Sequence, residues 1–184
     1  KRSRKYNIFN CNLDTQIIKD GVQVEETRLT NIHIYDKIDK KGWLYEMGIP
    51  VVQTDIPYDI DIQQRIPLND NRNNIDTNYL NEVKYHIIKF LLKNNLLIRK
   101  DLLGWGNDGL LKTWSFNTKE KEKVAKIIIE SEEFDKVVIK TSDKRMNDKA
   151  IQKGYEPVSI NFLDYKLKSI IEQTVQTSDN LVQS

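Results

Sequence analysis

Three aspartates in one extended stretch have the spacing that most nearly resembles a site for chemistry. Asp55, Asp59 and Asp61 are separated by even numbers of residues, so an extended chain would send their carboxylates out from one face. Divalent cations such as calcium and magnesium prefer oxygen ligands of this kind, and a small metal-dependent enzyme is therefore one hypothesis. The alternative is a solvated strand face, because no lysine or glutamate follows at the spacing of a metal nuclease. We favour the solvated face and assign no metal ligand.

The side chains that most often act as nucleophiles and bases are few. The single cysteine, Cys11, has no neighbours that would lower its pKa, and no Gly-x-Ser-x-Gly motif occurs. His33 falls between two isoleucines of a predicted strand, and His86 precedes an apolar pair of a predicted helix. Half-buried packing explains both histidines better than a role as ligand or general base. We therefore assign no catalytic residue.

A glycine-rich stretch and three nearby aromatic residues suggest further binding hypotheses. Residues 104–109 resemble a phosphate loop in composition, but no Lys-Ser or Lys-Thr pair follows, which favours a surface turn. Trp105, Trp114 and Phe116 could stack on bases, and the chain would then be a nucleic-acid-binding module. The alternative is that these rings dock a loop onto a core. Bulk charge gives the module little support, since 29 basic against 27 acidic residues leave a net charge of only +2.

A polar motif at residues 142–155 opens a predicted helix directly after a predicted strand. Free amides and the helix dipole at such a place can receive an anion. The alternative is a helix capped by Ser142 and stopped at Gly154, and we prefer it.

Composition bounds the class of protein. The chain has 184 residues, 39% of them hydrophobic and 30% charged, which is enough apolar side chain for a core. One cysteine makes no intrachain disulfide and fits a reducing compartment. Because no apolar run reaches membrane-spanning length and no signal-peptide core is present, we expect a cytoplasmic protein without membrane contact. The start at Lys1, without a methionine, leads us to expect part of a longer polypeptide.

The elements that would position these residues begin with a mixed or antiparallel sheet and one long helix. Apolar residues at helical spacing predict the helix over residues 79–92, with Asp76 or Thr77 as its cap and Asn94-Asn95 as its stop. A polar turn precedes it at 69–74. Five segments alternate or are otherwise strand-like: residues 6–13, 28–35, 43–47, 49–54 and 58–66. Pro50, Pro57 and Pro67 should then lie at strand ends, edges or bulges, because proline lacks the amide donor of a central strand.

The remaining elements predict a small αβαβα unit, so the fold class is α+β, with an α/β second part. Asn117 and Glu120 form a capping box, residues 137–139 and 158–160 read as strands, and Asn161 with Asp164 caps a last helix. Helix between the two strands favours their parallel pairing. The predicted domains are residues 1–101 (mixed sheet), 102–116 (Gly/Trp linker), 117–173 (small α/β unit) and 174–184 (flexible tail).

Two blocks of sequence resemble a known superfamily. Residues 42–51, Gly-Trp-Leu-Tyr-Glu-Met-Gly-Ile-Pro-Val, and residues 61–72, Asp-Ile-Gln-Gln-Arg-Ile-Pro-Leu-Asn-Asp-Asn-Arg, are similar to the region after the nucleotide pocket in GHKL ATPases. These are the histidine-kinase, gyrase and Hsp90-like proteins, including phage rIIA-like proteins. Residues 142–155 look like the distal part of the same proteins. The resemblance implies that residues 6–95 are a transducer, which senses bound nucleotide and relays its state to dimer contacts.

The resemblance also implies one nucleotide-sensing residue. Transducers commonly send a basic side chain from a glutamine-containing loop to the γ-phosphate, and Gln63-Gln64-Arg65 is the match, with Arg65 as the sensor. The pattern departs from the family elsewhere, because no magnesium-holding acidic helix and no Asp-x-Gly-x-Gly adenine pocket occurs. We therefore expect no ATP binding by the chain alone. The leading hypothesis is an accessory region that serves an upstream ATPase domain, which would hold ATP and magnesium, or that forms a homodimer.

Overall fold

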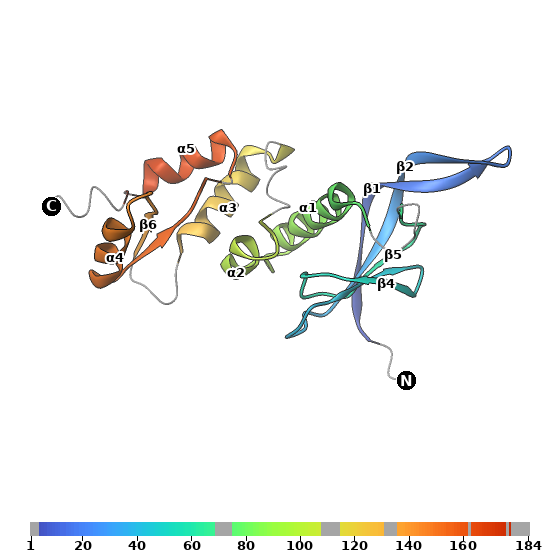
Figure 1. The fold of residues 1–184 in the computed structure, drawn as a ribbon, viewed down its shortest axis with the longest axis horizontal. Coiled ribbons are helices and arrows are strands. Elements are labelled where there is room, and N and C mark those ends of the chain that lie inside the picture. The colour runs from blue at the N-terminus through green and yellow to red at the C-terminus, as the bar shows by residue number, and fades with distance from the viewer. Residues whose placement is uncertain are drawn as a thin grey trace. The chain divides into compact units, whose positions relative to one another are not determined.

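The computed structural model describes residues 4–68, 75–107, 115–130, 136–161, 163–175 and 177. The chain divides into two compact units, Lys1–Phe90 and Leu91–Ser184 (Figure 1). Across the described residues the protein is α+β, with five helices and a mixed five-stranded sheet, so the coarse fold class is as predicted. None of the helices in these ranges is long and apolar enough to cross a membrane. The predicted turn at residues 69–74 lies outside the described residues.

A long antiparallel hairpin begins the first unit. Strands β1 (Tyr6–Lys19) and β2 (Val22–Tyr35) pair along their whole length (Figure 1). Asp20 and Gly21 connect them with φ of 50° and 78°, the left-handed pair typical of a two-residue hairpin turn. The prediction that these strands cover only residues 6–13 and 28–35 is wrong. The alternation of apolar and polar side chains is broken at Ile17-Ile18 and at Glu25-Glu26. The pairing continues to the turn because backbone hydrogen bonds do not require that alternation.

Three short strands complete the sheet. They are β3 (Trp43–Glu46), β4 (Ile49–Gln53) and β5 (Ile60–Ile62), and the strand order is β1-β2-β5-β3-β4. Strand β5 runs antiparallel to β2 and parallel to β3, which confirms the mixed sheet. Pro50 lies in the edge strand β4, as predicted for a residue without an amide donor. The prediction of one strand over residues 58–66 is wrong in extent, because the chain leaves the sheet after Ile62.

One face of this sheet forms the core of the first unit. Ile34, Ile60 and Leu44 lie directly opposite one another on β2, β5 and β3, and all three are buried. Helix α1 (Thr77–Lys93) covers the same face, where Phe90 stacks on Phe9 at 4.8 Å between ring centroids. Other fully buried side chains of this unit are Leu13, Ile32, Ile56, Ile62, Ile66, Ile87 and Ile88.

The ends of α1 follow the predicted capping chemistry. The Asp76 carboxylate accepts hydrogen bonds from the amides of Asn78 at 2.8 Å and Tyr79 at 3.2 Å, so Asp76 is the cap. After the last turn, Asn95 takes a left-handed φ of 56°, which confirms the predicted stop.

The second unit contains a parallel strand pair. Strands β6 and β7 pair in parallel, and α4 connects them, which confirms the predicted crossover. Helix α4 packs on β7, and α3 packs on α5. The elements of this unit are α2 (Arg99–Leu103), α3 (Thr118–Ile129), β6 (Lys136–Ile139), α4 (Lys144–Gln152), β7 (Tyr155–Val158) and α5 (Tyr165–Thr174).

Several local predictions for the second unit need correction. Strand β7 begins at Tyr155, three residues before the predicted strand at 158–160, because Tyr155 packs on Val138 of β6 and Ala150 of α4. The cap of α4 is Asp143 and not Ser142, since the Asp143 carboxylate accepts the Arg145 amide at 2.9 Å. Helix α2 was not predicted, and it includes Leu102 and Leu103, which we assigned to the Gly/Trp linker.

The capping box of α3 was predicted correctly, with Asn117 and Glu120 exchanging hydrogen bonds of 2.9 and 3.1 Å. The cap of α5 is Asp164 alone, which accepts the amides of Lys166 and Leu167. The predicted pairing of Asn161 with Asp164 is therefore wrong, because the helix begins only at Tyr165. Within the predicted tail, Thr177 forms an isolated parallel bridge to Ile139 of β6. Residues 176 and 178–184 lie outside the described residues, and the predicted domain boundaries stay predictions.

The buried thiol of Cys11 gives a first testable prediction. Burial raises its pKa to about 12, so almost none of it is thiolate at pH 8. We expect the native chain to react with a thiol reagent such as DTNB at least about 100-fold more slowly than the same chain in urea. Rapid native labelling, at the rate of the unfolded chain, would contradict the buried position on β1.

Candidate functional site

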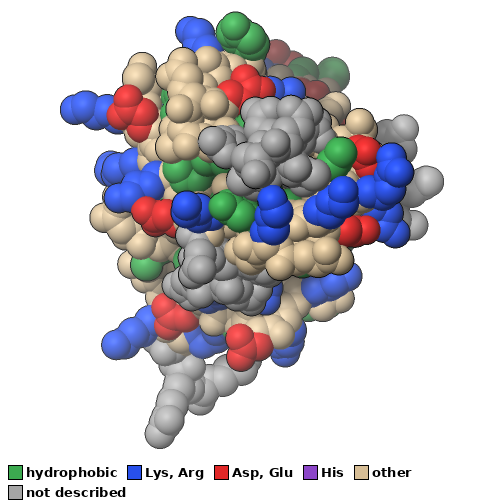
Figure 2. All heavy atoms as spheres, turned by 90° about the vertical axis from the view of Figure 1, so that its left-hand side faces the viewer, with side chains coloured by type: hydrophobic (Ala, Val, Ile, Leu, Met, Phe, Trp, Pro, Cys, Tyr) green, Lys and Arg blue, Asp and Glu red, His purple; other side chains and the backbone are tan. Residues whose placement is uncertain are grey.

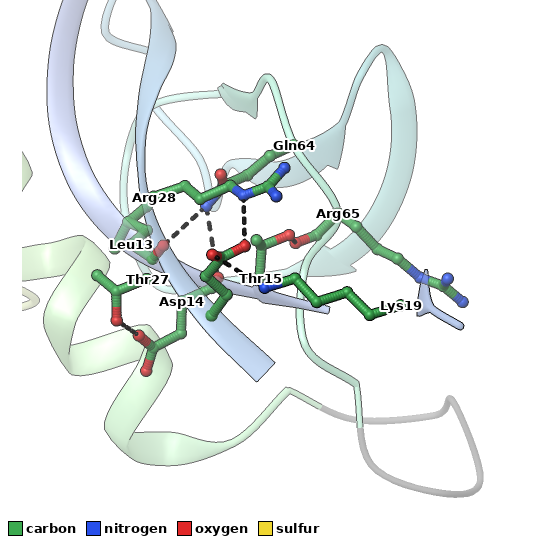
Figure 3. Close-up of polar contacts among 9 residues, drawn as sticks. Leu13, Asp14, Thr15, Lys19, Thr27, Arg28, Gln64 and Arg65 are labelled. Carbon is green, nitrogen blue, oxygen red and sulfur yellow. Dashed lines mark hydrogen bonds and ion pairs between the residues drawn. The ribbon is translucent and has the colours of Figure 1, made fainter. Parts of the chain in front are cut away.

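The Gln63-Gln64-Arg65 segment leaves the end of β5 and lies against β1. The Gln64 side-chain amide donates to the carbonyl oxygens of Leu13 at 3.0 Å and Asp14 at 3.4 Å. The Thr15 hydroxyl donates to the Arg65 carbonyl at 2.7 Å (Figure 3). Thr15 is almost fully buried. The Gln64 side chain and the Thr15 side chain therefore both tie the Gln64–Arg65 peptide to β1.

The same segment is tied to the neighbouring strands. The Gln63 amide donates to the Asn31 carbonyl of β2 at 3.0 Å. The Ile66 amide donates to the Glu46 carboxylate of β3 at 2.8 Å. Hydrogen bonds to three strands thus hold residues 63–66 in one conformation, and the Arg65 side chain starts from a rigid backbone.

The Arg65 guanidinium differs from the cations around it. In Figure 3 its side chain extends away from Gln64, and no dashed line reaches its nitrogens. Nearby, Arg28 and Lys19 share the Glu26 carboxylate at 2.7 and 3.6 Å, and the hydrogen bond from Arg28 lowers the pKa of Glu26. Within the described ranges, the Arg65 side chain has no hydrogen bond or ion pair. No described residue therefore neutralises its charge, which is available to a ligand.

The three aspartates do not form one site. Asp55 pairs with Lys84 at 2.9 Å, Asp59 accepts the Trp43 amide at 2.8 Å, and Asp61 accepts the Gly48 amide at 2.9 Å. The expectation of a solvated face is wrong for two of them, since Asp59 and Asp61 are only 6% and 7% exposed. In the described part of the chain no three His, Cys, Asp or Glu residues come together as metal ligands would.

Both histidines are half-buried packing residues, as predicted. His33 stacks on Tyr6 with 4.6 Å between ring centroids. In His86, burial in α1 lowers the pKa of the imidazole, and Nε2 lies 3.3 Å from a Glu82 oxygen. The two rings lie on different elements and on opposite sides of the sheet, so they form no common site.

The aromatic residues proposed for base stacking are turned inward. Trp105 is 9% exposed, and its indole nitrogen donates to the buried Asp101 carboxylate at 2.9 Å. Phe116 is 4% exposed. The third ring, Trp114, lies outside the described residues, as does Gly109 of the glycine-rich stretch. Docking of a loop onto a core therefore describes Trp105 and Phe116 better than a stacking platform.

The motif at residues 142–155 serves the fold of the second unit. The buried Asn147 side chain exchanges hydrogen bonds with both backbone groups of Thr141, at 2.9 and 3.0 Å. This contact ties the first turn of α4 to the loop that leaves β6. Asp143 also places a carboxylate at the start of the helix. This carboxylate accepts the Arg145 amide and would repel an anion. These contacts favour the capped helix over an anion site. The sequence signal for the role of Asn147 would have been an asparagine four residues after the cap.

Comparison with known proteins found no family model, curated protein or solved structure that matches this chain.

Proposed function

We propose that this chain is a non-catalytic accessory region of a larger GHKL-type ATP-binding protein, in which Arg65 contacts the terminal phosphate of a nucleotide held by an upstream domain. One observation carries the proposal: a guanidinium without a partner in the described ranges projects from a backbone that three strands hold. The choice of the GHKL family rests on the resemblance of residues 42–51 and 61–72. In such a protein this chain would relay the state of the bound nucleotide or form a homodimer.

The physical argument for Arg65 rests on preorganisation. A guanidinium can donate two parallel hydrogen bonds to phosphate oxygens, and such charge-assisted bonds are about twice as strong as neutral ones. Thr15 and Gln64 already fix the adjacent peptide, so binding would order only the side chain. Gln63 and Gln64 would then act by positioning Arg65, and neither would contact the phosphate itself.

The two alternative functions have less support. A metal-dependent enzyme needs its aspartates together, yet Asp55, Asp59 and Asp61 bind three different partners. A nucleic-acid-binding module needs open ring faces and a continuous basic surface. Trp105 and Phe116 are buried, and on the face drawn in Figure 2 basic side chains are interspersed with acidic ones.

Calorimetry tests the proposal in two stages. The isolated chain, titrated with ATP and magnesium, should show no micromolar binding, and tight binding would contradict the accessory role. In the longer polypeptide, Arg65→Ala should weaken ATP binding about tenfold, because a charged hydrogen bond contributes about 1.5–3 kcal/mol. ADP binding should change by less than about twofold, since the γ-phosphate is absent.

Arg28→Ala is the matched control for that measurement. Arg28 is an arginine of the same unit, and its guanidinium is already paired with Glu26. Its loss should leave ATP binding unchanged. Equal losses for Arg28→Ala and Arg65→Ala, or no loss for Arg65→Ala, would remove Arg65 from the site.

A further inference from the structure

The face of the sheet opposite α1 carries aromatic and acidic side chains in register. Because Ile34, Ile60 and Leu44 point into the core, the adjacent residues Tyr35, Asp59 and Trp43 point to the other face. The Tyr35 amide donates to the Asp59 carbonyl at 3.0 Å, which confirms that these two residues are neighbours.

A second row lies beside the first on the same face. His33, Asp61 and Tyr45 are directly opposite one another on β2, β5 and β3. Tyr6 stacks on His33 and lies 5.3 Å from the Tyr35 ring, measured between centroids. Aromatic side chains therefore lie beside the carboxylates of Asp59, just before β5, and of Asp61, within β5. Trp43 and Tyr6 are 40% and 45% exposed. Such a combination of ring faces and a carboxylate attracts a cation.

The Asp59 carboxylate is a fixed part of this face. Its side chain is only 9% exposed, and the Trp43 amide holds one oxygen at 2.8 Å. The other oxygen accepts a hydrogen bond from a guanidinium nitrogen of Arg4. Arg4 also lies over the Tyr35 ring, with 5.0 Å from the guanidinium carbon to the ring centroid.

The two partners of this ion pair are unequally anchored. Arg4 precedes β1, and its side chain is 49% exposed, whereas the carboxylate and the ring beneath it belong to the sheet. The hydrogen bond to Asp59 raises the pKa of Arg4 above its ordinary value, so the occupant is a cation at every physiological pH. The carboxylate and the ring are thus held by the sheet, and Arg4 reaches them from the segment that precedes β1.

We propose that Asp59, Tyr35 and the surrounding aromatic side chains form a binding site for an arginine side chain, that Arg4 occupies it within the chain, and that an arginine of a partner polypeptide takes its place when Arg4 withdraws. This site is independent of Arg65 and of nucleotide, and either proposal can fail without the other. Asp59 supplies the charge and Tyr35 the ring face. A guanidinium suits both groups better than an ammonium, because it is planar, weakly hydrated and able to stack.

Nuclear magnetic resonance on the full chain provides the test, with the backbone amide of Trp43 as the reporter next to Asp59. The probe is N-acetyl-arginine amide, whose only charge is the guanidinium. The receiving variant carries Arg4→Gln together with Arg2→Gln, so that neither arginine of the segment before β1 can fill the site. We expect this variant to bind the probe about tenfold more tightly than the unchanged chain, where Arg4 competes at a high effective concentration.

Three controls decide the outcome. N-acetyl-citrulline amide, which has the same shape without the charge, should not bind, and N-acetyl-lysine amide should bind several-fold more weakly than the arginine probe. Adding Asp59→Asn, which retains an oxygen for the Trp43 amide, should abolish binding. Arg28→Gln, an arginine change elsewhere on the sheet, should not open the site.

The proposal is overturned by any of three results. They are no binding to the Arg2→Gln/Arg4→Gln variant, equal binding to the unchanged chain, or binding that survives Asp59→Asn. Equal affinity for arginine and lysine probes would overturn the assignment to a guanidinium. An unchanged amide spectrum outside the Trp43 region shows in each variant that the fold is retained.

Discussion

Replacing Gly42 with alanine should unfold or severely destabilise the first unit. A Cβ at this position would lie 1.9 Å from the Tyr58 carbonyl oxygen and 2.8 Å from that of Ile56. Both are backbone atoms, and Gly42 is itself tied to this segment by a 2.7 Å hydrogen bond from its amide to Ile56. The clash cannot be relieved by a rotamer change, so we expect a loss of about 4 kcal/mol or more, measured by urea unfolding.

Gly48→Ala is the matched control for Gly42→Ala. Gly48 lies in the turn between β3 and β4 with a φ of +84°, and a Cβ there would meet nothing within 4 Å. The cost should be only the left-handed backbone, about 1 kcal/mol. Similar urea midpoints for the two variants would show that the close approach at Gly42 is not as the structure has it.

The hairpin shows how much of the fold the sequence predicts. In residues 6–13 of β1 and 28–35 of β2, apolar and polar side chains alternate, because Cys11, Leu13 and Ile32 are buried on one face. These parts of the two strands were predicted. The outer halves were missed because Thr15 is the one buried residue in 14–19 and 22–27, and one position does not make an alternating pattern. The Asp20-Gly21 pair is a strong turn signal, and it would have located the hairpin from the sequence.

The second unit was easier to predict because its signals are local. The capping box at Asn117 and the carboxylate at Asp164 satisfy amides two or three residues away, so the sequence itself contains both partners. The start of β7 was missed because it depends on packing between Tyr155 and residues of β6 and α4. Such contacts join distant parts of the chain, and one sequence does not reveal them.

The candidate sites follow the same rule. Arg65 was selected from a family resemblance. The contacts that fix its backbone join Thr15 to Arg65 and Glu46 to Ile66, across 50 and 20 positions of sequence. The pairing of Arg4 with Asp59 spans 55 residues, and no pattern in the sequence indicates it. The aspartates were grouped by spacing alone, whereas the fold gives each of them a different partner.

The buried Lys84 gives the second large effect, and removal of its partner should be worse than removal of the lysine itself. The Lys84 side chain in α1 is 3% exposed, and its ammonium lies 2.9 Å from the Asp55 carboxylate, which is 50% exposed. Asp55→Ala leaves a buried cation without this counter-charge and should cost about 2 kcal/mol, below the usual 3–5 because water reaches Asp55. Lys84→Met removes the charge but keeps the volume, and should stay within about 1 kcal/mol.

Urea unfolding of the two single variants and of the double variant separates these effects. Once the cation is absent, Asp55 has no buried charge to neutralise, so Asp55→Ala should cost almost nothing in the Lys84→Met background. The coupling between the two positions should therefore be about as large as the effect of Asp55→Ala alone. Additive effects, or a Lys84→Met variant less stable than Asp55→Ala, would mean that the Lys84 ammonium is held by its other contacts and that Asp55 is an ordinary surface carboxylate.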